Sequence, residues 1–342
     1  MGAEKMEGSN LIVRVFMKIL VLCIGLSCWV TRLQGAERDM TVVTVLGTAG
    51  IKEYEEKFVE VAKGWKEACE RGGVRLIAVG NEKKDSKKVD RERLKETISA
   101  EIERGTSGLW VVLIGHGTFD GRETKFNVRG PDFTDSDLAD WLKPFKGTLV
   151  VVNTASSSAP FIKALSGENR VVITATKSAN EIFYPHFGEY FAQAVGGLKA
   201  ADLDNDDQVS LLEAFLYAGH EVKQFFEKEG RIATEHAMLD DNGDQQGVRV
   251  EGFEGVLAVR SEKEEEEARP DGERAHQIHL APNELESLIP ESLRLRRDEL
   301  ERLVRALRRK RDEMDKEKYY RDLEKLLLEI ARIYEQVEGS DS

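Results

Sequence analysis

The segment from residue 202 to residue 213, DLDNDDQVSLLE, places oxygen-bearing side chains at alternate positions. A calcium-binding EF-hand loop has ligands at positions 1, 3, 5, 7, 9 and 12, the last on the following helix. Asp207 stands at position 6, where glycine is usual because the chain turns sharply. The alternative is an acidic cap on the helix that begins near Ser210. The pattern predicts a Ca²⁺ site with the ligands Asp202, Asp204, Asp206, Gln208 through its backbone carbonyl, Ser210 and Glu213.

A second acidic segment follows about 40 residues later, with the same alternation but a weaker match. Gly247 occupies a position that is usually apolar, and the stretch before the segment is too short for a long entering helix. The alternative is a polar turn. We predict a second, weaker calcium site with the ligands Asp240, Asn242, Asp244 and Glu251. The histidines beyond residue 180 have no spacing typical of zinc; they are His186, His220, His236, His276 and His279.

Two apolar runs end in residues that could form a catalytic pair. The run at 109–115 is followed by His116, and the run at 148–154 is followed by Ala155 and three serines. In a parallel sheet, ligand sites lie outside the carboxyl ends of the strands. We therefore expect His116 and the Ala-Ser segment to lie at one edge of the sheet.

With these strand ends, the sequence resembles the caspase–haemoglobinase fold and, within it, the legumain-like cysteine peptidases and their bacterial relatives. In that family one strand ends in His-Gly, the next ends in an acidic or amide residue followed by Ala-Cys, and the two form the catalytic dyad. TATKSANE, at 174–181, is similar to the family's Thr-Ala-rich segment beside the substrate pocket. The resemblance covers roughly residues 40–255. It implies His116 as the catalytic histidine and puts the nucleophile at Ala155 or Ser156.

The absence of cysteine at that position leaves two interpretations open. A thiolate is already populated near neutral pH, whereas a serine hydroxyl needs a well-oriented base to remove its proton. In the first interpretation the chain is a pseudopeptidase that keeps the peptide-binding groove and has lost the chemistry. In the second, it is a hydrolase in which Ser156 or one of the next two serines is activated by His116. Asp120 and Asp132 are then the candidates for the acid that orients the histidine.

Apolar runs alternate with helical patterns over residues 40–258, which predicts an α/β domain with a mostly parallel, caspase-like sheet flanked by helices. One helix carries an apolar stripe at spacings of three and four that ends at Cys69, so we expect a buried thiol there. The expected strands are 41–47, 74–80, 109–115, 148–154 and 171–176, and the first two helices are 53–70 and 89–103.

The N-terminus has the features of a secretory signal peptide. An apolar run at 15–30 follows Arg14 and precedes Gly35-Ala36, so we expect a signal peptide over residues 1–36 and cleavage near Ala36. Met17 is an alternative start. The protein is then periplasmic or secreted; the alternative is an uncleaved membrane anchor.

The character of the sequence changes after residue 258. Residues 259–280 contain a run of charges with Pro and Gly, which predicts an acidic, disordered linker. Residues 284–338 carry leucines and other apolar residues at spacings of three and four, which predicts a helical coiled-coil segment. A hairpin within one chain and self-association between chains remain equally open.

The overall charge limits the class of partner. The chain has 50 Lys and Arg against 63 Asp and Glu, a net charge of −13, which argues against nucleic acid as a partner. We expect an exported, calcium-binding protein that acts by binding an unknown protein or peptide, with a serine-dependent hydrolase as the alternative.

Overall fold

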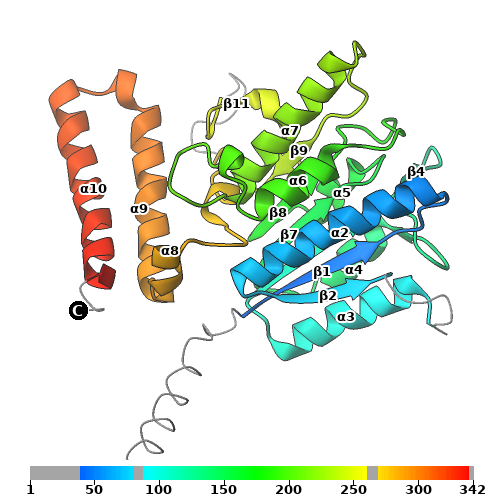
Figure 1. Cartoon of the computed structure of the whole chain (residues 1–342). Helices are drawn as coiled ribbons and strands as arrows, with labels where there is room; N and C mark the ends of the chain where they lie inside the picture. Colours follow the sequence, from blue (N-terminus) through cyan, green and yellow to red (C-terminus); the bar gives the residue numbers. More distant parts are fainter. Residues whose placement is uncertain (1–38, 81–87, 260–268, 339–342) are drawn as a thin grey trace, which may run out of the picture. The chain divides into compact units, whose positions relative to one another are not determined.

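The computed structural model describes residues 39–80, 88–259 and 269–338 (Figure 1). Its central sheet has seven strands in the order β10-β9-β8-β7-β3-β1-β2. Five neighbouring strands, β8, β7, β3, β1 and β2, pair in parallel. Strands β9 and β10 at the other edge pair antiparallel. The strands are β1 (Met40–Leu46), β2 (Arg75–Val79), β3 (Gly108–Ile114), β7 (Thr148–Asn153), β8 (Arg170–Thr174), β9 (Met238–Asp240) and β10 (Val248–Arg249).

Helices cover both faces of this sheet, as the alternating pattern predicts. Successive side chains of a strand point to opposite faces, so β1 places Val42 in one core and Val43 in the other. Helices α2 (Lys52–Gly72), α6 (Phe187–Val195) and α7 (Leu211–Lys228) contribute to the first core. Helices α3 (Asp90–Arg104), α4 (Asp135–Leu142) and α5 (Pro160–Leu165) contribute to the second.

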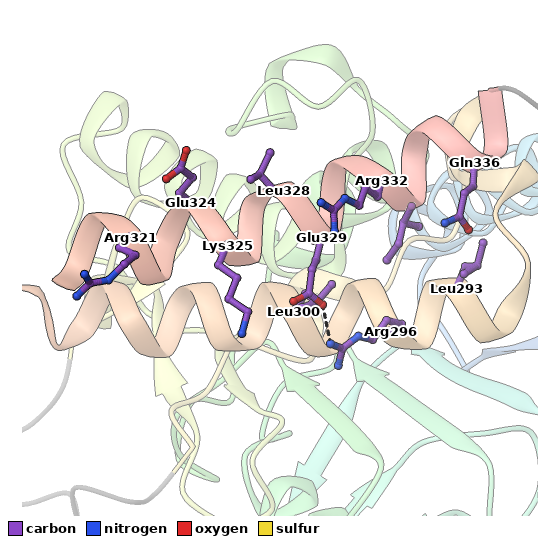
Figure 2. Close-up of a pocket in the computed structure, with 11 residues that line it drawn as sticks. Leu293, Arg296, Leu300, Arg321, Glu324, Lys325, Leu328, Glu329, Arg332 and Gln336 are labelled. Atoms are coloured by element: carbon purple, nitrogen blue, oxygen red, sulfur yellow. Dashed lines mark hydrogen bonds and ion pairs between the residues drawn. The ribbon is translucent and has the colours of Figure 1, made fainter. Parts of the chain in front are cut away.

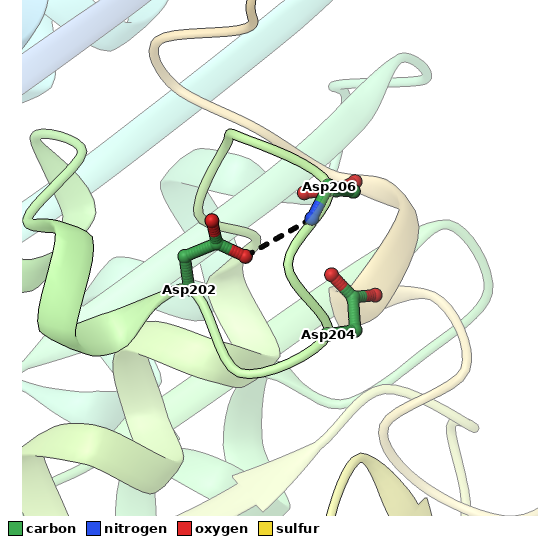
Figure 3. A group of neighbouring side chains, drawn as sticks. All are labelled: Asp202, Asp204 and Asp206. Atoms are coloured by element: carbon green, nitrogen blue, oxygen red, sulfur yellow. Dashed lines mark hydrogen bonds between the residues drawn. The ribbon is translucent and has the colours of Figure 1, made fainter.

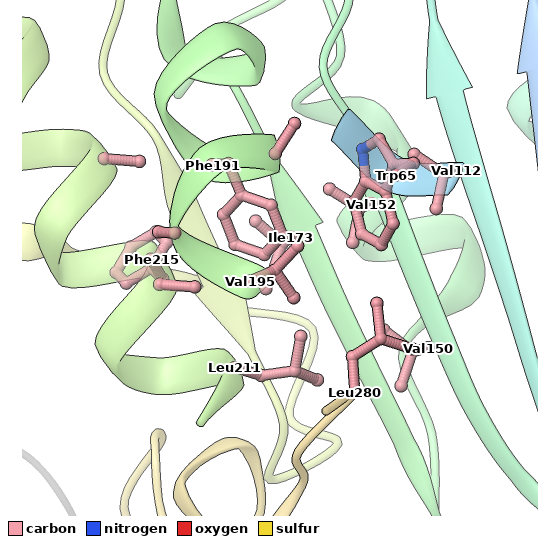
Figure 4. Packing of buried hydrophobic residues seen from close by; sticks show 14 of the residues in the cluster. Trp65, Val112, Val150, Val152, Ile173, Phe191, Val195, Leu211, Phe215 and Leu280 are labelled. Atoms are coloured by element: carbon pink, nitrogen blue, oxygen red, sulfur yellow. The ribbon is translucent and has the colours of Figure 1, made fainter. Parts of the chain in front are cut away.

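The first core is rich in aromatic rings. Trp65 of α2 packs against Phe191 of α6, with ring centroids 5.9 Å apart, and Phe215 of α7 lies in the same cluster (Figure 4). Cys69 is buried on the apolar stripe of α2, as predicted, and burial raises the pKa of its thiol to about 12. This thiol is therefore a packing group.

Several short elements lie outside the central sheet and the long helices. A three-stranded sheet consists of β4 (Gly117–Phe119), β5 (Thr124–Phe126) and β6 (Phe133–Thr134), and β4 and β5 form the hairpin that follows His116. The other short elements are β11 (Phe253–Glu254), β12 (Leu257–Ala258), η1 (Lys199–Ala201), η2 (Val250–Gly252), η3 (Ala275–Gln277) and η4 (Arg311–Glu313).

The predicted linker extends too far. Its residues 260–268 lie outside the described part of the chain, but residues 269–280 pack on the α/β domain. Leu280 is fully buried in the first core (Figure 4). Buried Asp241 accepts hydrogen bonds from the backbone N–H groups of Gly272 and Ala275, at 3.0 and 2.7 Å. Composition alone does not predict this packing, because the backbone groups of residues 269–280 are bonded to a residue, Asp241, that is distant in the sequence.

The C-terminal segment forms a helical hairpin within the chain. It contains α8 (Glu284–Leu288), α9 (Glu291–Arg309) and α10 (Lys316–Glu338). Helices α9 and α10 pack against each other, and a small separate core is built from Ile289, Leu300, Ile333 and Val337. Of the two arrangements left open by the sequence, the structure shows the hairpin; whether chains also associate stays a prediction.

The predicted signal peptide and the alternative start at Met17 lie outside the described residues. Within the described residues, no helix combines the length and apolar character needed to cross a membrane.

Candidate functional site

His116 and Ala155 lie at the same edge of the sheet. They follow β3 and β7, which are adjacent parallel strands whose register pairs Leu113 with Asn153. Ala155 is fully buried in the second core. The first of the two positions that the resemblance assigns to the nucleophile therefore holds a methyl group, which packs in the core and cannot act as a nucleophile.

Of the three serines that follow, Ser156 and Ser158 make hydrogen bonds through their hydroxyls. Ser156 Oγ donates to the carbonyl of Gly117 at 2.9 Å and lies 3.2 Å from the N–H of the same residue, which donates to it. Ser158 Oγ lies 3.1 Å from Thr176 Oγ1. Ser157 is fully buried with φ at 54°, and its hydroxyl has no hydrogen-bond partner among the described residues. The hydroxyls of Ser156 and Ser158 connect the end of β7 to neighbouring segments.

The ring of His116 is enclosed by aromatic side chains. Its centroid lies 4.6 Å from that of Tyr54, 5.2 Å from that of Phe58 and 5.9 Å from that of Tyr184. Burial lowers the pKa of His116, and a hydrogen bond with the backbone of Ala49 opposes this effect. The ring of His116 is thus packed against aromatic side chains, and its burial favours the neutral imidazole.

Neither candidate acid orients this histidine. The carboxylate of Asp120 accepts from the backbone N–H groups of its own turn and pairs with Lys125. The carboxylate of Asp132 accepts from Val128 N and from Asn127 Nδ2. In the described part of the chain, no hydrogen bond joins His116 to either carboxylate or to Ser156. A Ser-His-acid relay is therefore not assembled among the described residues.

Exposed apolar side chains lie on the loop that packs against His116. Ile182 and Phe183 are 63% and 64% exposed, immediately before Tyr184, and Ile51 is 57% exposed on the loop that leads from β1 to α2. Large apolar side chains at a strand-end edge are suited to contact with another chain.

The first acidic loop gathers its carboxylates. Ligand oxygens of Asp202, Asp204 and Asp206 all lie within 4.8 Å of one another (Figure 3). The loop turns through left-handed conformations at Asn205 and Asp207, with φ of 60° and 63°. Asp207 therefore adopts the conformation that glycine usually provides at position 6, at some cost in backbone energy. Burial, aided by the charges of Asp204 and Glu213, raises the pKa of Asp206 to about 6.

Cationic groups from outside the loop contact these carboxylates. Lys199 Nζ lies 2.7 Å from Asp202 Oδ2 and 2.9 Å from Asp207 Oδ1. His276 Nε2 lies 3.2 Å from Asp204 Oδ2 and holds the pKa of Asp204 below its usual range. The contact of His276 was missed from sequence because it lies in the segment expected to be a linker.

Ser210 and Glu213 form a capping box at the start of α7. Glu213 Oε1 accepts from the N–H groups of Leu203 and Asp204, and Oε2 accepts from the N–H and the hydroxyl of Ser210. A carboxylate has about four lone-pair sites, so Glu213 is occupied as a cap in this structure. The cap and the metal site, posed as alternatives by the sequence, involve the same residues.

The second acidic loop joins two strands. Asp240 is the last residue of β9 and is 1% exposed. Asn242 Oδ1 accepts from the N–H of Asp244 at 2.8 Å. Glu251 lies in η2 with its side chain 61% exposed, and its one ion pair within the described ranges is with Arg249.

A groove of about 610 Å³ runs along the α9–α10 hairpin (Figure 2). Its lining combines apolar residues such as Leu300 and Leu328 with the ion pair of Arg296 and Glu329, 2.8 Å apart. The groove contains no nucleophile and no carboxylate cluster, so we place the candidate chemistry at the sheet edge and the acidic loops.

The chain is therefore an α/β protein with a mostly parallel sheet, a packed strand-end histidine and an acidic loop that could hold a cation. The crystal structure of the Drosophila initiator caspase Dronc is similar at 14% identity and TM-score 0.41, covering 64% of this chain and 85% of that chain. The X-ray structure of a secreted C11 cysteine protease from Bacteroides thetaiotaomicron, in complex with an irreversible peptide inhibitor, is similar at 11% identity and TM-score 0.38. That match covers 59% of this chain and 66% of the other. The sequence matches no family model and no curated protein. At these identities and TM-scores, the two structures give no information on the activity of this chain.

Proposed function

We propose that this chain is an exported calcium-binding protein on a caspase-like scaffold, without peptidase activity, that binds a peptide or protein at the sheet edge beside His116. The observation that carries the calcium part is the group of three carboxylates, Asp202, Asp204 and Asp206, in a loop with the alternation that Ca²⁺ prefers. Ca²⁺ takes six to eight oxygen ligands, so the carbonyl of Gln208 and water would complete the site.

The contacts that the proposed ligands already make set an expectation for the affinity of the loop for Ca²⁺. Lys199 and His276 must give up their contacts with the carboxylates, and Glu213 must share its oxygens between backbone donors and the ion. Together with the left-handed Asp207, these features favour a dissociation constant of about 10⁻⁴–10⁻³ M, the range of extracellular calcium modules. Such an affinity suits a structural role better than a sensing role.

The loss of catalysis rests on the edge between β3 and β7. A nucleophile must lie within hydrogen-bond reach of its base, and the base must be oriented by a third group. Ala155 offers no such group, and the proton of Ser156 is directed to the carbonyl of Gly117. What remains at this edge is an apolar surface that includes Ile182 and Phe183, which supports binding without turnover.

A peptide-hydrolysis assay on the purified protein tests this assignment. Fluorogenic peptides covering basic, acidic, amide and apolar residues before the cleaved bond are incubated with wild type, His116→Ala and Ser156→Ala, each with Ca²⁺ and with chelator. We expect all six samples to match the buffer blank. Turnover in wild type that disappears in both variants would establish the serine hydrolase and refute the pseudopeptidase.

A further inference from the structure

The second acidic loop repeats the backbone of the first. The first loop takes left-handed φ values at its fourth and sixth residues, Asn205 and Asp207, at 60° and 63°. The second loop, counted from Asp240, does the same at its fourth and sixth residues, Gly243 and Gln245, at 87° and 69°. In both loops the carboxylate of the fifth residue accepts from the N–H of the seventh, at 3.1 Å in the first loop and 2.7 Å in the second.

The closing carboxylate also has a counterpart, which comes from a distant part of the sequence. In the first loop, Glu213 Oε1 accepts from the N–H groups of the second and third residues, at 2.8 and 3.2 Å. In the second loop, Asp271 Oδ1 accepts from the N–H groups of the second and third residues, Asp241 and Asn242, at 2.8 and 3.2 Å. Asp271 thus occupies the place that position 12 has in the first loop.

The second loop also holds one buried carboxylate oxygen without a hydrogen-bond partner. Asp240 is 1% exposed, and its Oδ2 accepts no hydrogen bond within the described residues. Asp271 is 4% exposed, and its Oδ1 accepts from the N–H groups of Asp241 and Asn242. Buried carboxylates are normally paired or bound to a metal, because desolvating an unpaired charge is costly.

Asp241 is not part of this set, although it lies between two of its members. Its two oxygens accept from the N–H groups of Gly272 and Ala275, and Arg269 contacts its backbone carbonyl. Asp240, Asp244 and Asp271 have no ion pair in the part of the chain that the structure describes. Asp240 and Asp271 are therefore buried carboxylates without an ion pair among the described residues, and Asp244 is exposed.

We propose that Asp240, Asn242, Asp244 and Asp271 bind a second divalent cation, with Ca²⁺ as the favoured ion because all the donors are oxygens. Among the described residues only the first loop has three carboxylates whose ligand oxygens all lie within 4.8 Å of one another, so a bound ion would draw the carboxylates of the second loop together. Asp271, which lies 27 residues beyond Asp244, closes the site in place of Glu251. Because Asp271 belongs to residues 269–280, the ion joins that segment to β9. The choice of cation follows the proposed function, but the site does not depend on the first loop.

Calorimetric titration of the full chain with CaCl₂ tests the proposal by stoichiometry. Wild type is expected to bind two ions, and both Asp271→Asn and Asp204→Ala are expected to bind one. Glu251→Gln is the matched control, because it removes a carboxylate at the twelfth position of the second loop, and it should still bind two. The proposal is overturned if Asp271→Asn keeps every site of wild type or if Glu251→Gln loses one.

A second variant and an unfolding measurement distinguish loss of this site from misfolding and from effects of the first loop. Asp240→Asn should lose the same ion as Asp271→Asn, so it carries the test if the latter does not fold. In chelator, Asp271→Asn should unfold at no lower temperature than wild type, because it relieves repulsion among buried carboxylates. A single wild-type site that Asp271→Asn abolishes and Asp204→Ala spares would support this site and contradict the first. The reverse pattern would contradict this site and spare the proposed function.

Discussion

Ser156 shows how a residue can occupy a catalytic position in sequence and serve packing in the structure. Its hydroxyl both donates to and accepts from the backbone of Gly117, and so joins the end of β7 to the start of β4. A general base that removed this proton would also break a contact between two elements of the fold. The sequence predicts the neighbourhood of His116 and Ser156, but hydrogen-bond direction depends on where the backbone of Gly117 lies.

Glu235 provides a prediction at the residue scale, because it is buried and its carboxylate accepts from the N–H groups of His186 and Phe187. Burial raises its pKa from 4.5 to about 7. A raised carboxyl pKa means that the folded state binds the proton more tightly, so this contribution to stability is complete below pH 4.5 and is lost as pH rises to about 7. The difference of about 2.5 units corresponds to roughly 3 kcal/mol at most.

The measurement is the free energy of unfolding from pH 4 to pH 8, in chelator, for wild type and Glu235→Gln. We expect the stability of wild type relative to Glu235→Gln to fall between about pH 4.5 and 7 and to be level above. Parallel curves for the two proteins would show that the carboxyl of Glu235 titrates normally in the folded state.

At the scale of elements, the strands and the first helices could be read from sequence because their signals are local. The five predicted strands fall on β1, β2, β3, β7 and β8, within two residues at each end. The helix predicted at 53–70 is α2, whose buried residues include Phe58, Trp65 and Cys69. Continuous apolar runs predict buried strands, and apolar residues at spacings of three and four predict a helix with one buried face, so both patterns can be recognised without knowledge of distant contacts.

Other contacts could not be read from sequence, because they join residues that are far apart. Asp271 pairs with the backbone of residues 241 and 242, and His276 with Asp204. Both come from a segment whose composition is typical of a solvated linker. The interpretation failed there because charge composition does not show the partners of the charged residues, which lie in the two acidic loops.

The α9–α10 hairpin has its own small core, which leads to a prediction about local stability. Leu300 is 1% exposed in that core, and truncating such a leucine costs roughly 2–5 kcal/mol. We expect Leu300→Ala to speed amide hydrogen exchange in α9 and α10, while exchange in β3 stays unchanged.

Leu303→Ala is the matched control on the same helix, because Leu303 is 45% exposed and its truncation should change stability by about 0.5 kcal/mol or less. Faster exchange in β3 as well as in the hairpin of Leu300→Ala would contradict separate cores, since it would mean that the two unfold as one unit.

At the scale of the whole molecule, the first acidic loop connects parts of the chain that are distant in sequence. The loop precedes α7, which packs on the sheet, and Asn283 donates to the carbonyl of Asp206 and to the side chain of Gln208. His276 contacts Asp204 and lies 3.2 Å from Arg305 of α9. An ion held by this loop would therefore stabilise the sheet, the packed segment 269–280 and the approach to the hairpin together.

The most direct test of the central claim is thermal unfolding of wild type and Asp204→Ala, each in Ca²⁺ and in chelator. A ligand that binds only the folded state adds RT ln(1 + [L]/Kd), so this loop should contribute roughly 2.7 kcal/mol at a hundredfold excess over Kd. The difference between Ca²⁺ and chelator is compared within each protein, which removes any effect of the substitution on the fold itself. We predict a higher unfolding temperature for wild type in Ca²⁺, and a clearly smaller shift for Asp204→Ala. The same shift in both proteins, or none in wild type, would contradict calcium binding by residues 202–213 and leave the loop as an acidic cap on α7.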